Sequence, residues 1–200
     1  MRYPPDHKVK ARDAMLKAGA RGLKSSGFNG IGVDGLASAA GVTSGAFYSN
    51  FASKEAMLDA VIDAGLGEPL LSDTDSASVA AGRATLTGFL REYINIDHCA
   101  DPAEGCVMPA LSADVSRAQP SVKDTYARKM SALVTRIAGL LDGDESDREQ
   151  RAWSVVAIMV GAILVARGMP ERSGLRRAVL DSALGTALAL TDVDTDAEPV

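Results

Sequence analysis

The segment that most constrains this chain is 33–58, VDGLASAAGVTSGAFYSNFASKEAML, whose pattern predicts two short helices joined by a tight turn. Leu36, Ala37 and Ala40 give the first helix one apolar face, and its alanines are small enough for a second helix to cross closely. Gly41 permits the turn, because only glycine enters positive φ at little cost. Val42 can fill the crossing point between the two helices.

The second helix of this segment has one inward and one outward face. Thr43 or Ser44 can cap its first turn with a side-chain oxygen. Phe47 and Phe51, four residues apart, share the inward face, which leaves Tyr48 and its two neighbours, Ser49 and Asn50, outside. The segment therefore predicts a helix-turn-helix whose second helix is sized for the DNA major groove.

The same stretch resembles the DNA-binding domain of the TetR family of one-component repressors. The matching elements are Gly27-Phe28, Leu36-Ala37-x-x-Ala40-Gly41-Val42, Gly45-x-Phe47-Tyr48-x-x-Phe51 and Ser53-Lys54-Glu55-x-Met57-Leu58. The resemblance is specific over residues 8–60, and beyond them it covers only the organisation of the helices.

The resemblance implies DNA contacts for eight residues. Tyr48 would donate its hydroxyl to one phosphate, and Lys54 would contact another. The other six comprise four at the end of the recognition helix that reads base edges and two further candidates for base or backbone contact: Thr43, Ser44, Gly45 and Ala46, then Ser49 and Asn50. Two departures weaken the expected phosphate grip: Gly32 stands where the family often has Thr, and Ser44 where Lys or Arg is common.

The rest of the sequence predicts an all-α fold. Ala and Leu, strong helix formers, are abundant, and no long stretch alternates β-branched or aromatic residues. Nine helices are expected, at about 7–26, 33–40, 44–51, 54–66, 76–97, 106–118, 120–141, 146–168 and 174–190. We therefore expect a helix-turn-helix domain over 1–54, a connecting helix over 54–66, a ligand-binding and dimerisation domain over 67–190, and a disordered tail over 191–200.

The charge distribution agrees with a DNA-binding N-terminal part. The whole chain carries a net charge of −5. Residues 1–54 contain eight Lys and Arg against three Asp and Glu, whereas residues 66–200 contain thirteen against twenty. DNA phosphates attract the first part and repel the second; chance clustering of solvated charges is the alternative explanation.

The resemblance also implies a homodimer held together by the last two helices, the eighth and ninth expected. Apolar residues recur in them at helical spacing, and Gly161 allows close approach of a partner helix. These residues are Trp153, Val156, Val160, Ile163 and Leu164 in the first helix and Leu180, Leu184 and Leu188 in the second. The alternative is that they fill the core of a monomer.

A small-molecule effector would bind among the fourth to eighth helices. Eight candidate lining residues are Phe89, Tyr93, Cys106, Met108, Leu111, Tyr126, Met130 and Met159. Methionine adapts to irregular ligands, but ordinary core packing is the simpler explanation for any single one of these residues. Cys106 lies in a Gly-Cys element that resembles one seen in a branch of the family in which such a cysteine senses electrophiles or oxidants. Its alternative role is a small thiol that packs a helix start.

These observations predict a ligand-responsive transcription regulator, a repressor that a small molecule releases from a palindromic operator. A thiol-dependent enzyme using Cys106 and a DNA-architectural protein are the alternatives, although neither histidine is placed as a general base. We expect no enzyme activity and no cofactor. His98, Cys99, Asp101, Glu104 and Cys106 lie close in sequence but lack a metal-ligand spacing, so no metal is expected. The start has no secretory signal, and the apolar run 153–166 is too short for a membrane span, so a cytoplasmic protein is expected.

Overall fold

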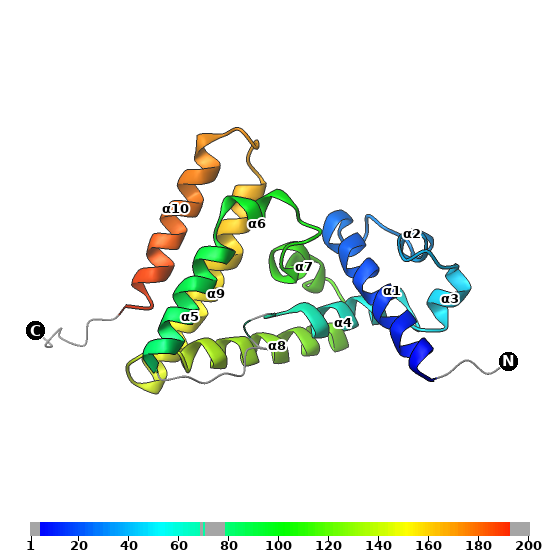
Figure 1. The fold of residues 1–200 in the computed structure, drawn as a ribbon, viewed down its shortest axis with the longest axis horizontal. Helices are drawn as coiled ribbons and strands as arrows, with labels where there is room; N and C mark the ends of the chain where they lie inside the picture. Colours follow the sequence, from blue (N-terminus) through cyan, green and yellow to red (C-terminus); the bar gives the residue numbers. More distant parts are fainter. Residues whose placement is uncertain (1–4, 69, 71–78, 193–200) are drawn as a thin grey trace, which may run out of the picture. The chain divides into compact units, whose positions relative to one another are not determined.

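The computed structural model describes residues 5–68, 70 and 79–192, and within these ranges it contains helices and no strand (Figure 1). The all-α prediction is confirmed. The helices are α1 (Pro5–Ser26), α2 (Val33–Ala39), α3 (Ser44–Tyr48), α4 (Lys54–Gly65), α5 (Val79–Tyr93), α6 (Ile96–Ala100), α7 (Val107–Val115), α8 (Pro120–Ala138), α9 (Glu145–Arg167) and α10 (Gly174–Ala189).

The first compact unit joins Met1–Leu66 to Pro102–Lys129. In it α1 packs against α2, α4 and α7. A glycine makes one of these crossings possible, because a Cβ on Gly19 would lie only 2.4 Å from Met57 Sδ. The core of the unit contains fully buried residues from α1, α2, α4 and α7, among them Leu23, Leu36, Leu58, Ile62 and Leu111.

The second compact unit joins Gly67–Asp101 to Met130–Val200. Here α9 and α10 pack against each other, and α5 and α6 complete the unit with the second half of α8. Arg151, 6% exposed, connects three parts of it: its guanidinium donates to Asp147 of its own helix, to Leu190 O at 3.0 Å and to Asp142 O. A buried arginine with these partners keeps its charge compensated.

The described helix boundaries agree with the predictions to within three residues except between 93 and 106. The expected helix 76–97 ends at Tyr93, and a short helix, α6, occupies part of the region expected to be a loop. Asn95 is the reason, because its side chain accepts a hydrogen bond from His98 N at 2.8 Å and caps a new helix. The tail expected to be disordered from 191 begins later, because Thr191 is fully buried and its hydroxyl donates to Leu188 O at 2.7 Å. The rest of that tail, from 193 onward, and the start of the fifth helix at 76 lie outside the described residues.

The division into a DNA-binding domain and an effector domain is a functional prediction that the compact units do not test. They show only that α7 and the first part of α8 cluster with the N-terminal helices.

Candidate nucleic-acid interface

The turn between α2 and α3 has the geometry that the sequence predicts. Gly41 has a φ of 68°, and Val42 N donates to Ala37 O at 2.9 Å. Of the two predicted caps, Thr43 is the N-cap of α3, and its hydroxyl oxygen accepts from Ala46 N at 3.2 Å. This bond satisfies a backbone N–H that the first turn of a helix leaves unpaired.

Two phenylalanines fix α3 to the core of its unit. Phe47 is fully buried and Phe51 is 2% exposed, and their ring centroids lie 5.7 Å apart. The guanidinium of Arg12, from α1, lies 4.5 Å from the Phe51 centroid, a cation–π contact. Tyr48, between them in sequence, is 57% exposed. The predicted inward face is therefore confirmed, and so is the outward position of Tyr48 and Ser49, whereas Asn50 is half-buried.

Three polar side chains of the predicted contact set, Ser44, Ser49 and Asn50, donate hydrogen bonds within the protein. Ser44 Oγ donates to Asp34 Oδ1 at 2.5 Å. Ser49 Oγ donates to Gly45 O at 2.9 Å, and Asn50 Nδ2 donates to Ala46 O at 2.8 Å. The sequence pattern did not indicate Asp34 as a neighbour of α3, because this contact joins two helices across ten residues.

Lys54 begins α4, after Ser53, which caps that helix. Its Nζ donates to Phe28 O at 2.7 Å and to Ile31 O at 3.1 Å, and it lies 4.1 Å from the centroid of the Phe28 ring. Lys54 therefore holds the α1–α2 connection against α4. An ammonium group has three donors, so two are directed to these carbonyl oxygens.

Gly32 is the N-cap of α2 and forms no side-chain cap. Its φ is −87° and its ψ is 173°, an extended conformation open to any residue. A Cβ placed there would meet nothing within 4 Å. The structure has room for the Thr that the family often carries at this place.

Cys106 is the N-cap of α7, where its half-buried Sγ accepts from Met108 N at 3.4 Å. Two contacts connect the loop before it to α1. Lys24 Nζ donates to Gly105 O at 2.8 Å, and Arg21 forms an ion pair with Glu104. The two residues that precede the thiol, Glu104 and Gly105, are thus both bonded to side chains of α1.

Cys99 has a different environment in the second unit. It is 1% exposed, and burial raises the pKa of its thiol, an effect that Arg176 and Arg167 oppose only in part. Arg176, itself 7% exposed, donates to Cys99 O at 3.2 Å. Among the described residues, no group of three or more His, Cys, Asp and Glu side chains is arranged to hold a metal ion.

The eight predicted effector residues are divided between the two units. The first unit contains Cys106, Met108, Leu111 and Tyr126, and the second contains Phe89, Tyr93, Met130 and Met159. In the first, Ser112 Oγ lies 2.8 Å from the Tyr126 hydroxyl and donates to Met108 O at 2.6 Å. In the second, the Phe89 and Tyr93 ring centroids lie 5.7 Å apart. None of these eight residues lines the groove between α9 and α10, and their role stays a prediction.

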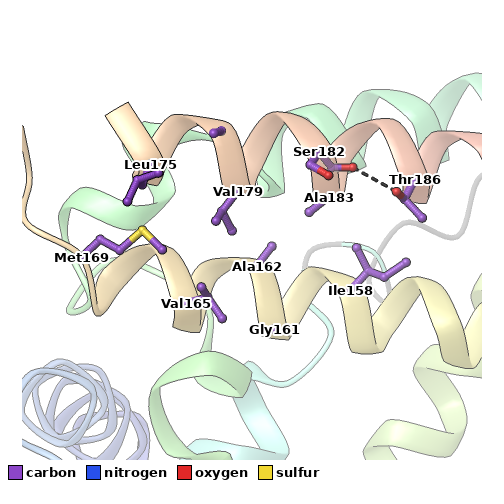
Figure 2. Close-up of a pocket in the computed structure, with 11 residues that line it drawn as sticks. Ile158, Gly161, Ala162, Val165, Met169, Leu175, Val179, Ser182, Ala183 and Thr186 are labelled. Atoms are coloured by element: carbon purple, nitrogen blue, oxygen red, sulfur yellow. Dashed lines mark hydrogen bonds between the residues drawn. The ribbon is translucent and has the colours of Figure 1, made fainter. Parts of the chain in front are cut away.

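The groove between α9 and α10 is lined mainly by apolar side chains of the second unit. Figure 2 shows its side chains projecting from two adjacent helices, and they are Ile158, Gly161, Ala162, Val165, Met169, Leu175, Ala178, Val179, Ser182, Ala183 and Thr186. Leu175 is 66% exposed and Val165 51%, and along α9 Leu164 is 48% and Trp153 44% exposed. By contrast Val156, Ile163 and Leu180, which were expected in the dimer stripes, are buried in the core of their own unit.

The helix α9 is long and apolar enough to cross a membrane, with 23 residues and a mean hydropathy of 1.4 over its best window. This corrects the expectation that the apolar segment is too short, which rested on the run 153–166 alone. Because 44% of that window is buried inside the protein, and core helices pass the same test, the helix is weak support for a membrane span.

Comparison with known proteins gives one family match. Residues 15–61 match the family model for bacterial regulatory proteins of the tetR family. No match was found among curated proteins.

Solved structures with a similar fold cover almost the whole chain. NemR of E. coli in its reduced form is 20% identical with a TM-score of 0.71, over 93% of this chain and 99% of that one. A TetR-family regulator from Cytophaga hutchinsonii is 19% identical with a TM-score of 0.71, over 94% and 96%. The regulatory protein TetR from Rhodobacter sphaeroides is 23% identical with a TM-score of 0.65, over 91% and 99%.

Proposed function

We propose that this protein is a dimeric, ligand-responsive repressor, because residues 15–61 match the family model for regulatory proteins of the tetR family and the chain has the fold of solved TetR-family regulators. In this proposal a small molecule bound in the C-terminal part releases the protein from a palindromic operator. The helix-turn-helix of α2 and α3 carries the proposal, since Phe47 and Phe51 hold α3 to the core while Tyr48 stays exposed beside it.

The proposed DNA contacts begin with the exposed phenol of Tyr48, which has a hydroxyl to donate to a phosphate. Lys54 would add a charge, and its remaining donor would serve a phosphate while the other two hold the α1–α2 connection. Contacts of this kind set the register of a protein on the duplex and carry no sequence information. Base reading would fall to residues 43–46, 49 and 50, on or beside α3.

The proposed partner in the dimer is a second copy of this chain, packed on α9 and α10. Large apolar surfaces are exposed there by Trp153, Leu164 and Leu175. Removing such surfaces from water by packing against a partner lowers the free energy of the dimer. The groove between the helices also contains small residues, including Gly161 and Ala178, over which a partner helix can approach closely. A dimer would present two recognition helices to two half-sites.

Effector binding would act through the helices that connect the C-terminal part to α3, and would change the distance between the two recognition helices of the dimer. This requires that the effector binds the protein more tightly in the conformation with one spacing than in the other. We propose a cytoplasmic location, because a transcription regulator acts in the compartment that contains its DNA.

A second candidate function is thiol sensing at Cys106. The observation that favours it is the contact of its loop with α1, through Lys24 to Gly105 O and Arg21 to Glu104. A modified thiol at the start of α7 would displace this loop, and the displacement would be transmitted to a helix of the DNA-binding domain. Treatment with an electrophile should abolish DNA binding by the wild type but not by Cys106→Ser. If the variant loses DNA binding as well, another residue is the sensor.

Selection from a pool of random duplexes tests the proposed function. The purified protein should enrich an inverted repeat whose half-sites lie about one helical turn apart. A scrambled duplex of the same composition, measured at the same salt concentration, is the control. If no sequence is enriched over the scrambled control, the proposal is wrong; if enrichment succeeds, the enriched duplex becomes the probe for a screen of small molecules that release it.

A further inference from the structure

The side of α3 opposite the two phenylalanines carries short side chains. Phe47 and Phe51 point into the core, so the helical period of 3.6 residues turns Gly45 and Ser49 to the opposite side and sets Ala46 beside them. Gly45 and Ser49 are exposed, and Ala46 is half-buried. Between 43 and 50 no Arg, Lys, Gln or Glu is present to reach a base edge.

The polar groups on this face already have protein partners. Ser44 donates to the Asp34 carboxylate, Ser49 donates to Gly45 O, and the Asn50 amide donates to Ala46 O. Bidentate contacts from Arg or Lys to guanine and from Asn or Gln to adenine are the commonest means of direct readout. The first is absent from this segment, and the second would require Asn50 to give up its bond to α3.

Two methyl groups lie at the start of α3, that of Thr43 on an exposed residue and that of Ala46 on a half-buried one. Thr43 is exposed, and because its oxygen accepts the Ala46 N–H, its position is fixed by the cap. Ala46 follows three residues later, and residues with this spacing are neighbours on the surface of a helix. An apolar contact of this type has one counterpart in the major groove, because only thymine presents a methyl group there.

We propose that this protein recognises thymine methyl groups through the Cγ2 of Thr43 and the Cβ of Ala46, and that hydrogen bonds to base edges from residues 43–50 are secondary. The inference rests on the proposed function, since it assigns the base contacts of the same helix. It makes Thr43 and Ala46 the specificity-determining residues, while Tyr48 and Lys54 serve the phosphates.

Replacement of single thymines by deoxyuridine tests this assignment, because it removes the methyl group and leaves base pairing intact. The probe is the duplex that the protein enriches from random DNA, and its affinity is measured by fluorescence anisotropy. We expect about a fourfold loss per half-site at one or two thymines, the value of one buried methyl group. Replacement of a cytosine by 5-methylcytosine outside these positions should have no effect.

Two variants connect the loss to the protein. Thr43→Ser keeps the capping oxygen and removes the methyl group, and Ala46→Gly removes the other methyl. Each should bind the thymine and deoxyuridine duplexes equally at the position it contacts. Ser38→Ala, exposed on α2, is the control and should keep the discrimination. Thermal unfolding of each variant shows whether it is folded at the temperature of the binding measurement.

The outcomes separate the two proposals. If the wild type enriches no sequence, the proposed function fails and takes this inference with it. If a sequence is enriched but every thymine tolerates deoxyuridine, or Thr43→Ser and Ala46→Gly discriminate as the wild type does, the function stands and the methyl readout is wrong.

Discussion

At the scale of single residues, Gly32 marks a place where this chain lacks a group that its fold can accommodate. The N-cap of α2 has no side-chain oxygen, and a Cβ there would meet nothing within 4 Å. We expect Gly32→Thr to change the free energy of unfolding by only a few tenths of a kcal/mol, because Gly and Thr are similar N-caps.

The same substitution should strengthen DNA binding. A hydroxyl at the start of α2 adds one hydrogen bond to a phosphate, worth about 1 kcal/mol or about fivefold in affinity per half-site. Anisotropy with the enriched duplex measures it, and Gly32→Ala, which adds a Cβ without a hydroxyl, should bind as the wild type does. Equal gains in the two variants would show that the hydroxyl is not in contact with DNA.

The two cysteines should differ in their reactivity toward iodoacetamide. Burial raises the pKa of the Cys99 thiol. At a given pH a smaller fraction of Cys99 is therefore thiolate, the reactive form, than in a cysteine with the ordinary pKa. Cys99 is also 1% exposed, whereas Cys106 is only half-buried. Mass spectrometry should find Cys106 alkylated in the folded protein, and Cys99 only after unfolding.

A Cys106→Ser variant should accordingly take up no label under native conditions. Rapid labelling of Cys99 in that folded variant would contradict the packing of α6 against α9.

The neighbours of Lys54 show what the sequence alone could not supply. The helix-turn-helix, the glycine turn and the inward phenylalanines follow from local pattern, because each depends on residues within one or two helical turns. Lys54 bonds to carbonyl oxygens 23 and 26 residues away in sequence. No periodicity encodes such a contact, so its second role in the α1–α2 connection became visible only in the structure.

At the scale of helices, the sequence predicted where α9 and α10 lie but not which of their residues face inward. Apolar residues recur on both helices at helical spacing. This periodicity does not show which of the apolar residues lie in the core and which lie in an interface. The structure assigns Val156, Ile163 and Leu180 to the core and leaves Trp153 and Leu164 exposed. The short α6 was missed for a related reason, since five residues contain too little periodicity to signal a helix.

This division predicts which substitutions separate the dimer. Leu164→Glu and Leu175→Glu place a carboxylate on an exposed apolar surface, so each should leave the fold of the monomer unchanged. In a dimer packed on α9 and α10 each would bury an unpaired charge, at a cost of several kcal/mol. Sedimentation equilibrium should report monomers for both variants.

The control for this experiment is Ser131→Glu, which places the same charge on an exposed position of α8 in the same unit. It should remain dimeric. A dimer that persists in Leu164→Glu and in Leu175→Glu would place the interface elsewhere on the molecule.

At the scale of the whole molecule, the sequence carries opposite charges in its two parts, and this arrangement limits how it can meet DNA. Residues 1–54 are basic, with a net +5, and residues 66–200 are acidic, with a net −7. In the proposed complex the phosphates would repel the acidic part, which would favour orientations in which the helix-turn-helix faces the DNA. The fold class and the order of helices were predictable because they follow from composition and period; the effector residues were not, because their identity depends on how packed helices enclose a ligand.

The measurement that tests the central claim most directly is the affinity of the purified protein for DNA from its own upstream region, across a salt series, with Tyr48→Phe beside the wild type. The logarithm of the binding constant should fall linearly with the logarithm of salt concentration, as phosphate contacts require. Tyr48→Phe removes one exposed hydroxyl and should weaken binding about threefold to tenfold at every salt concentration, with the slope unchanged. Binding that is insensitive to salt, or equal in wild type and Tyr48→Phe, would contradict the assignment of α3 as the helix that meets DNA.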